Sequence, residues 1–221
     1  MLVSQLILRN VPVLAPGKAL AEVFPEDYPE GLVYAPVLDD NQFLGLLSLT
    51  DLEAEQDQHK LVGECQLEKI SQTVKESQHV FEIFPLFEKT GLPVLPVFND
   101  EMMFEGLISL DAIASSFSAS YGFQTEGGTL VLSTPAIHYS LSEISRLVEA
   151  NQGKVLSMLV EADPALSQNY LVHLKINQPD LSRIVATLER FEYHVLEVHQ
   201  ALEPTSIDKD RFDQLMRYLG I

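Results

Sequence analysis

The sequence of 221 residues predicts an α+β protein, and three observations lead to that class. Residues 1–120 repeat one pattern of helix, strands and turn at a spacing of about sixty residues. The stretch "YGFQTEGG" (121–128) ends in two glycines and is expected to be a linker. The residues after it follow the order β-α-β-β-α-β, which is the order of a ferredoxin-like sheet.

The internal repeat becomes visible when the sequence is shifted by sixty residues against itself. "ALAEVFP" (19–25) then meets "HVFEIFP", and "APVLDD" (35–40) meets "LPVFND". After one inserted residue, "FLGLLSL" (43–49) meets "FEGLISL". Matches that keep the same order over three elements indicate that one unit was duplicated.

Each repeat is expected to contain the same local elements. A helix comes first, around 19–24 in the first repeat and 80–89 in the second. A strand, a turn of Asp and Asn residues and a second strand follow, as in a β-hairpin. The second strand ends at Ser48 or Ser109, where another helix begins. A serine at this position commonly accepts a hydrogen bond from a free N–H group of the helix.

A duplicated β-α-β-β-α unit resembles the CBS domain when two motifs accompany it, and both are present here. A Pro-Val pair precedes the hairpin turn, and the pattern G-h-h-[ST]-x-x-D-h follows it, where h is apolar. CBS domains occur as tandem pairs, so we expect a pair at 1–60 and 61–120. The resemblance implies clefts for adenosine compounds such as AMP, ADP, ATP, S-adenosylmethionine or NAD.

The first repeat matches the motif at Gly45, Ser48 and Asp51, and Ala35 before the Pro-Val pair is a further candidate for ligand binding. The resemblance places Ser48 near the phosphate or ribose, and Asp51 on the ribose hydroxyls. A carboxylate is also favoured at the start of a helix. The alternative is that Ser48 only caps the helix and that the pair dimerises or transmits contacts without a ligand.

The second repeat departs from the motif. Gly106 and Ser109 are present, but Ala112 stands at the aspartate position and the nearby carboxylate is Asp111. One residue along a helix corresponds to a rotation of about 100°. Asp111 is therefore expected to point away from the direction of Asp51, so we predict at most one strong adenosine site per chain.

The chain is acidic, with a formal net charge of −18 at pH 7. Residues 1–120 contain six Lys or Arg against nineteen Asp or Glu. We expect no nucleic-acid partner, because such surfaces need clustered cations to displace counterions. No Lys or Arg occurs within 19–59 or 90–145. The expected ligand is therefore adenosine, AMP or a Mg²⁺-bridged nucleotide, in preference to free ATP.

The second half, at 128–200, resembles an ACT domain, a regulatory module that often binds amino acids at dimer interfaces. The loop after its first strand has Pro135, but Ala136 stands at the family's glycine position, which argues against an amino-acid site. A CBS pair followed by an ACT-like domain resembles bacterial acetoin-utilisation-type regulatory proteins. Apolar residues at helical spacing predict a terminal helix at 205–221 that docks on its own chain or on a dimer mate.

The sequence contains none of the common catalytic or metal-binding motifs. The sequence has no glycine-rich phosphate loop, no H-E-x-x-H motif and one cysteine, Cys65. His194, Glu197 and His199 share an expected strand, but alternation along it predicts His194 on the opposite face from the other two. We therefore expect no catalytic residues and no metal site.

These observations favour a non-enzymatic regulatory protein that forms a homodimer or a larger assembly. No apolar run approaches the length of a membrane helix, so no membrane partner is expected. A single cysteine and the lack of an export signal favour the cytoplasm. A ligand-free structural or interaction module and an undetected enzyme remain the alternatives, and the sequence names no protein target.

Overall fold

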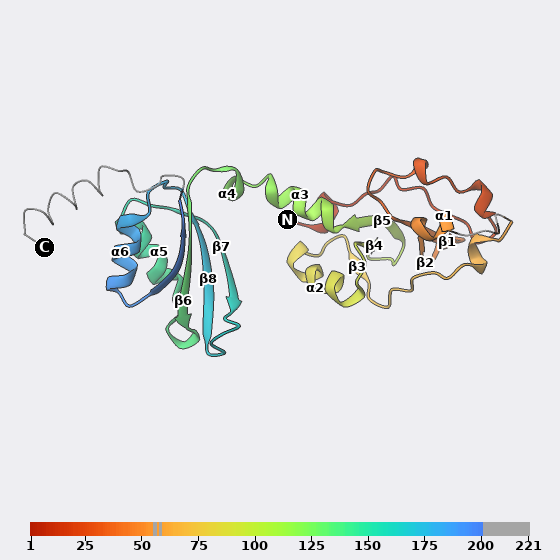
Figure 1. Cartoon of the computed structure of the whole chain (residues 1–221). Helices are drawn as coiled ribbons and strands as arrows, with labels where there is room; N and C mark the ends of the chain where they lie inside the picture. Colours follow the sequence, from red (N-terminus) through yellow and green to blue (C-terminus); the bar gives the residue numbers. More distant parts are fainter. Residues whose placement is uncertain (55–56, 58, 201–221) are drawn as a thin grey trace, which may run out of the picture. The chain divides into compact units, whose positions relative to one another are not determined.

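The computed structural model describes residues 1–200 except 55, 56 and 58, and it contains two compact units (Figure 1). Unit 1 is Met1–Phe117 and unit 2 is Ser118–Ile221. The helix predicted at 205–221 lies outside the described residues. No helix in the described part of the chain combines the length and apolar character that a membrane crossing requires.

The first repeat of unit 1 forms a hairpin and a short helix. β1 (Tyr34–Asp39) pairs antiparallel with β2 (Gln42–Ser48), and α1 (Leu49–Ala54) begins directly after β2. The turn residues Asp40 and Asn41 both have positive φ, which Asp and Asn adopt more often than most residues. The hairpin and the helix after it confirm the prediction.

The second repeat contains the full set of predicted elements. It begins with β3 (Val74–Lys75) and α2 (Val80–Thr90), and α2 confirms the helix expected there. β4 (Val94–Phe98) pairs antiparallel with β5 (Phe104–Ser109), while β3 lies parallel to β4. The repeat ends with α3 (Leu110–Ser118).

The two hairpins share one irregularity at the same place. The register shifts directly after Val37 in β1 and directly after Val97 in β4. Val37 faces Gly45, and Val97 faces Gly106, so the motif glycine sits beside the bulge in both repeats. Bulges are specific features that redirect a strand. Their equivalent positions confirm the duplication.

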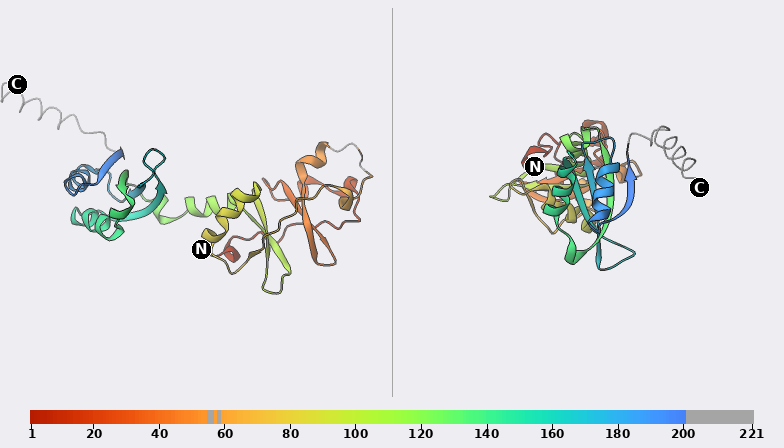
Figure 2. Two further views of the ribbon diagram at one scale, coloured as in Figure 1. Left: turned by 90° about the horizontal axis from the view of Figure 1, so that it is seen from below. Right: turned by 90° about the vertical axis from the view of Figure 1, so that its left-hand side faces the viewer.

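The hairpins lie side by side in unit 1 (Figure 2). Phe43 of β2 stacks on Phe104 of β5 with 5.8 Å between ring centroids, and it meets Phe98 edge-on at 5.6 Å. Leu46 and Leu107 belong to the same buried cluster. Hydrophobic burial therefore joins the two repeats into one core.

The first helix of the first repeat is the main departure from the predicted elements. At 19–24 the chain forms only a 3₁₀ turn, Leu20–Glu22, and a second such turn follows at Pro25–Asp27. Pro29 disfavours the helical conformation at the preceding residue, and Tyr28 is extended, with φ −97° and ψ 152°. The second repeat has no proline at the equivalent position, so α2 continues to its end.

The two repeats exchange their first segments. Leu8 forms a β-bridge with Leu107 in the second hairpin, although it belongs to the first sequence repeat. Glu68, sixty residues later, forms a β-bridge with Leu46 in the first hairpin. The sequence repeats 1–60 and 61–120 are therefore interleaved in space.

Matching 3₁₀ turns begin the exchanged segments. The turns are Val3–Gln5 and Val62–Glu64, and a leucine precedes each of them. The N–H of that leucine donates to the side chain of the third turn residue, at 2.8 Å in the first turn and 3.0 Å in the second. The first leucine, Leu2, bridges to His79 before α2, and the second bridges to Ala19. The shared pattern L-V-x-[QE] is a repeat signal that the shift by sixty residues does not align.

Unit 2 is an antiparallel sheet with strand order β7-β8-β6-β9 and two helices on one face (Figure 1). This order confirms the ferredoxin-like prediction. Part of the expected linker, α4 (Tyr121–Gln124), packs against β7 and so belongs to this unit. The other elements, in chain order, are β6 (Gly128–Pro135), a 3₁₀ turn (Ala136–His138), α5 (Leu141–Ala150), β7 (Val155–Ala162), β8 (Asn169–Ile176), α6 (Ser182–Arg190) and β9 (His194–His199).

The alternation predicted for β9 was wrong. Its partners on β6 are Ser133 for His194, Val131 for Glu197 and Thr129 for His199. These three β6 residues alternate along one strand and share a face, so their β9 partners share it too. The reason is a register shift between Val131 and Leu132, which inserts one residue into β9. Even so, the described residues contain no group of three His, Cys, Asp or Glu that could hold a metal ion.

Candidate functional site

A small pocket in unit 1 contains Asp51, the residue that the motif singled out. Its volume is about 160 Å³. Three buried leucines form an apolar floor, and four polar side chains complete the lining. The leucines are Leu20, Leu47 and Leu52, and the polar residues are Asp51, Lys60, Cys65 and Gln66. An apolar floor with a few polar groups around it is typical of small-molecule sites.

Asp51 is positioned by the start of α1. Ser48 Oγ accepts a hydrogen bond from the Asp51 N–H at 3.1 Å, so Ser48 caps the helix. In the second repeat, Ser109 Oγ accepts from the Ala112 N–H, also at 3.1 Å. The identical bonds make Ala112 the structural equivalent of Asp51. Asp111 lies one position earlier, is exposed, and does not occupy the place of Asp51.

Gly45 and Gly106 permit the exchanged segments to cross the hairpins. A Cβ atom on Gly45 would lie 2.9 Å from the carbonyl oxygen of Glu68, closer than real Cβ contacts allow. A Cβ on Gly106 would clash with the carbonyl oxygen of Leu8. Both glycines also have positive φ, which other residues rarely adopt. The group that lies close to Gly45 is therefore a backbone carbonyl of the same chain.

Ala35 lies away from the pocket lining. It pairs with Leu47 across the hairpin and is fully buried in the core of unit 1. Its small side chain supports the strand that carries Leu47, one of the floor residues. Any part that Ala35 takes in ligand binding would therefore be indirect.

Tyr34 is a candidate residue that the sequence reading missed. It faces Ser48 across the hairpin. Burial raises the pKa of the Tyr34 hydroxyl, and the nearby carboxylates of Glu68 and Asp51 raise it further. The hairpin register thus places Tyr34 opposite the serine that caps the helix carrying Asp51. The signal in the sequence is its position at the start of β1, but recognising it requires the hairpin register. The equivalent residue facing Ser109 is Val94.

Lys60 corrects the expectation that the site lacks a cation. Residues 19–59 contain no Lys or Arg, but the next residue, Lys60, lines the pocket. The N–H of Leu20 donates to the carbonyl oxygen of Lys60 at 3.0 Å. The N–H of Val62 donates to the carbonyl oxygen of Lys18 at 2.9 Å. These backbone bonds fold the segment around Lys60 against the first repeat.

The equivalent region of the second repeat is apolar. The positions that correspond to Leu20, Leu47, Asp51 and Leu52 hold Val80, Ile108, Ala112 and Ile113. Val80, Ile108 and Ile113 are fully buried in one hydrophobic cluster. Leu6, which follows the first 3₁₀ turn as Cys65 follows the second, packs against this cluster. The first repeat therefore has a pocket with polar residues in its lining, and buried apolar side chains occupy the equivalent region of the second repeat.

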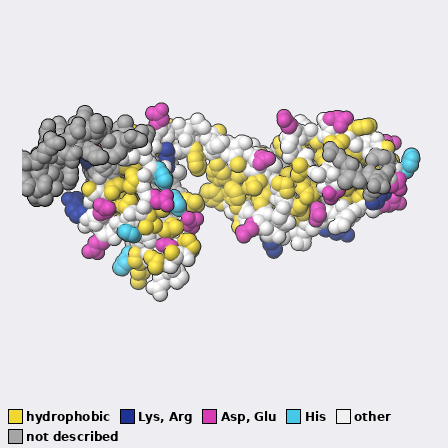
Figure 3. Space-filling model, viewed as in Figure 1, with side chains coloured by type: hydrophobic (Ala, Val, Ile, Leu, Met, Phe, Trp, Pro, Cys, Tyr) yellow, Lys and Arg dark blue, Asp and Glu magenta, His cyan; other side chains and the backbone are white. Residues whose placement is uncertain are grey.

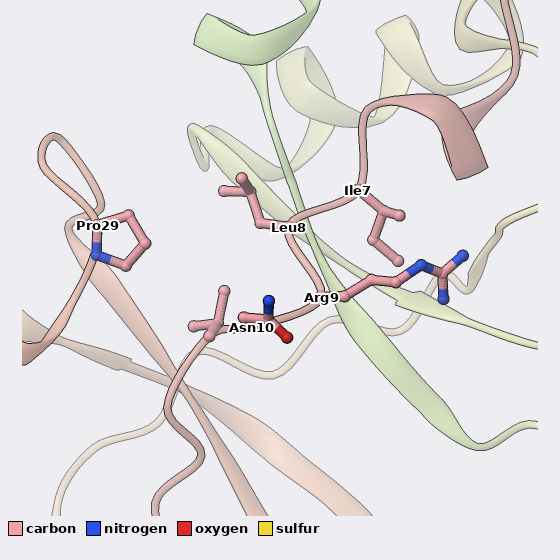
Figure 4. A pocket seen from close by; sticks show the side chains of 6 residues that line it. Ile7, Leu8, Arg9, Asn10 and Pro29 are labelled. Atoms are coloured by element: carbon pink, nitrogen blue, oxygen red, sulfur yellow. The ribbon is translucent and has the colours of Figure 1, made fainter.

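A second hollow in unit 1, of about 350 Å³, lies beside the crossing segment 7–11 and Pro29 (Figure 4). Arg9 extends away from Pro29 there. Its guanidinium donates to Glu76 Oε2 at 2.7 Å and to Glu105 Oε2 at 2.6 Å. The hydrogen bond to Glu76, together with both carboxylate charges, raises the pKa of Arg9. The Arg9 guanidinium therefore binds the crossing segment 7–11 to the second repeat.

Two interleaved hairpin–helix repeats followed by a ferredoxin-like sheet define a two-part α+β protein with a small polar pocket in one repeat. Residues 68–119 match the family model of the CBS domain. The chain thus contains a CBS domain, as the motif predicted. The first repeat, outside the matched residues, shares its hairpin, its bulge and its serine cap with the second.

Similar proteins have low sequence identity to this chain. The chain is 20% identical over 220 residues to the uncharacterised protein MJ0188 of Methanocaldococcus jannaschii, covering 98% of this chain and 81% of that protein. A CBS domain pair/ACT domain protein of Thermotoga maritima has 21% identity and a TM-score of 0.45, covering 53% of this chain and 96% of that one. CBSX2, solved in complex with AMP, has 21% identity and a TM-score of 0.44, covering 52% and 95%. The resemblance to acetoin-utilisation-type proteins stays a prediction.

Proposed function

We propose that unit 1 is a sensor module that binds one adenosine compound per chain at the Asp51 pocket. The observation that carries this proposal is the asymmetry between the repeats. Asp51 adjoins an apolar floor in the first repeat and Tyr34 pairs with Ser48 across the hairpin, while Ala112 and Val94 replace these two residues in the second repeat. A ribose offers two hydroxyl donors, and an ionised carboxylate can accept both.

Native mass spectrometry combined with calorimetry tests this proposal. Freshly purified protein is expected to carry a copurified adenosine compound, and calorimetry of the emptied protein should give one site per chain. At a hundred times its Kd, the ligand should stabilise the folded protein by about 2.7 kcal/mol. Two equal sites per chain would show that the register argument about Ala112 fails.

The proposed sensor acts as a homodimer through the aromatic face of α2 and α3. Phe117 stacks with Phe81 and with Phe84, and Phe81 remains 65% exposed. An open groove of about 460 Å³ lies beside them, lined by Phe84 and Leu110 among others. Figure 3 shows hydrophobic side chains gathered near α3. Exposed patches of this kind commonly mark interfaces, and a second copy is the partner that a symmetric dimer supplies.

Light scattering tests the dimer interface directly. Phe81→Glu places a charge in the middle of the aromatic face and should convert a dimer into a monomer. Phe24→Glu is the matched control, because Phe24 is a half-exposed phenylalanine of the first repeat and belongs to neither α2 nor α3. A monomeric wild type at tens of micromolar, or a dimer that persists in Phe81→Glu, would contradict the proposed interface.

In this proposal the protein is a non-enzymatic cytoplasmic regulator that passes the ligand signal to an unidentified protein target. Neither nucleic acid nor a membrane is part of the mechanism. The ligand would lie between Asp51 of α1 and the other residues of the pocket lining, and the dimer would carry the signal across two chains. Turnover of a nucleotide by the purified protein would contradict the non-enzymatic assignment.

One observation favours the alternative of a ligand-free interaction module. The pocket volume of about 160 Å³ is below the 300–1,000 Å³ that is typical of small-molecule sites. A thermal-shift series with AMP, ADP, ATP, S-adenosylmethionine and NAD, each with and without Mg²⁺, separates the two functions. No shift with any of them would make the motif a remnant of the fold, with Asp51 only favouring the start of the helix.

A further inference from the structure

Unit 2 contains a cavity of about 350 Å³ between the end of β6, the start of α5 and the connection from α6 to β9. Its volume lies within the range of 300–1,000 Å³ that is typical of small-molecule sites. One chain forms it, whereas the amino-acid sites of ACT domains often lie at dimer interfaces. The residues that line it are Thr134, Pro135, His138, Glu143, Phe191, Glu192 and Tyr193.

Thr134 gives this cavity a buried hydroxyl group without a partner. Only 3% of the residue is exposed, and its hydroxyl makes no hydrogen bond within the described part of the chain. Leu130 and Leu132, at alternate positions before it on β6, belong to one buried cluster with residues of α5 and α6. Thr134 therefore faces the helix-covered side of the sheet. Buried polar groups in proteins usually have a partner, and a ligand in the cavity would supply it.

Two carboxylates make the lining acidic, and no Lys or Arg belongs to it. The Tyr193 hydroxyl donates to Glu143 Oε2 at 3.2 Å and so holds this carboxylate in place. Burial, together with the Glu143 carboxylate, raises the pKa of Tyr193 to about 12, so the hydroxyl remains a donor at neutral pH. The Glu192 carboxylate makes no ion pair or hydrogen bond with any described residue.

Two arginines outside the lining stack on Phe191. The guanidinium carbons of Arg146 and Arg190 lie 5.4 Å and 5.6 Å from the centroid of the ring. Arg146 also approaches Glu143 Oε1 at 3.8 Å, which is longer than a hydrogen bond. A carboxylate on a ligand would therefore meet Glu143 and Glu192 without a cation among the lining residues, and this argues against an amino acid.

We propose that this cavity binds a small organic cation that carries ammonium groups and no carboxylate, such as an aliphatic diamine. Each ammonium group has three N–H donors, which match the carboxylates of Glu143 and Glu192 and the hydroxyl oxygen of Thr134. The methylene chain can lie along Phe191 and Pro135. The site is independent of the Asp51 pocket and does not depend on the proposed function.

An extended cation fits the lining better than a metal ion does. The described residues contain no group of three His, Cys, Asp or Glu that could hold a metal ion, so Glu143, Glu192 and His138 do not converge on one point. A diamine has two charged ends joined by a flexible chain, and it can reach acceptors that lie apart.

Calorimetry of the full-length chain with three matched compounds tests the ligand class. The compounds are cadaverine, lysine, which adds a carboxylate to cadaverine, and the diol that has hydroxyl groups in place of both ammonium groups. We expect one cadaverine per chain and no binding of the diol. Lysine should bind at least about tenfold more weakly, because its carboxylate faces like charges. Added salt should weaken cadaverine binding.

Two variants with matched controls test the residues. Glu192→Gln should weaken cadaverine binding about ten- to a hundredfold, the range of a charge-assisted hydrogen bond. Thr134→Val should weaken it about two- to tenfold, yet raise the melting temperature without ligand, because an unpaired buried hydroxyl is removed. The controls Glu189→Gln on α6 and Thr129→Val on β6 do not line the cavity and should leave the affinity unchanged.

Each contrary result identifies a particular error. Equal binding of lysine and cadaverine would make the cavity an amino-acid site and overturn the assigned class. Equal losses in Glu192→Gln and Glu189→Gln would show that the general acidity of the chain attracts the amine. No binding of cadaverine to wild type, or a loss of that binding in Asp51→Ala, would overturn the site in unit 2.

Discussion

Replacement of Asp51 by alanine is the perturbation that most directly separates ligand binding from folding. The substitution removes the carboxylate but keeps the backbone N–H that donates to Ser48 Oγ at 3.1 Å. The helix cap therefore survives, and only the ligand loses its partner. Charge-assisted hydrogen bonds are worth about 1.5–3 kcal/mol, so the affinity for adenosine or AMP should fall about ten- to a hundredfold.

The effect on folding should be small, because Asp51 is exposed. A surface substitution of this kind changes the free energy of unfolding by less than about 0.5 kcal/mol. Calorimetry measures the affinity, and a thermal melt without ligand measures the stability. A large loss of stability without ligand would show that Asp51 has a structural role.

Asp111→Ala is the matched control for this experiment. Asp111 is likewise an exposed carboxylate in the first turn of the helix after a hairpin, but it belongs to the second repeat. It should share the small change in stability and leave ligand affinity unaltered. Equal losses of affinity in the two variants would refute the argument, because a general change of charge would then explain both.

Three further predictions concern stability. Ser48→Ala should lower the free energy of unfolding by about 0.5–2 kcal/mol through the lost cap, with or without ligand, as denaturant titration can measure. Gly106→Ala should cost at least about 1–3 kcal/mol, because its Cβ would meet the Leu8 carbonyl at positive φ, whereas Gly17→Ala has open space and should be nearly neutral. Burial raises the pKa of Tyr28 from 10.0 to about 12, so the unfolded chain loses this proton at lower pH than the folded chain does. The free energy of unfolding should therefore fall as the pH rises from 10 to 12. Tyr28→Phe should reduce that fall, as denaturant titrations at each pH can measure.

The sequence by itself determined the features that depend on short stretches of chain. The Asp and Asn residues of the hairpin turns, the serines before α1 and α3, and the helical and strand periodicities all act between near neighbours. Their repetition at a fixed spacing revealed the duplication, and the same spacing showed that Ala112 occupies the position equivalent to Asp51. The order of elements in the second half was likewise sufficient for the ferredoxin-like sheet. One local prediction was wrong, because residues 19–24 contain only the 3₁₀ turn Leu20–Glu22 in place of the expected helix.

The tertiary structure alone decided which segments meet. Leu8 and Glu68 cross to the opposite hairpins, and that crossing brings Lys60 to the pocket and explains the glycines at 45 and 106. The pairing of Tyr34 with Ser48 depends on strand register, and the inserted residue in β9 reversed the expected face of His194. These outcomes arise from backbone hydrogen bonds between residues far apart in the chain. A linear pattern of residue types does not specify such pairings, because the same strand can bond to more than one neighbour until the core selects one.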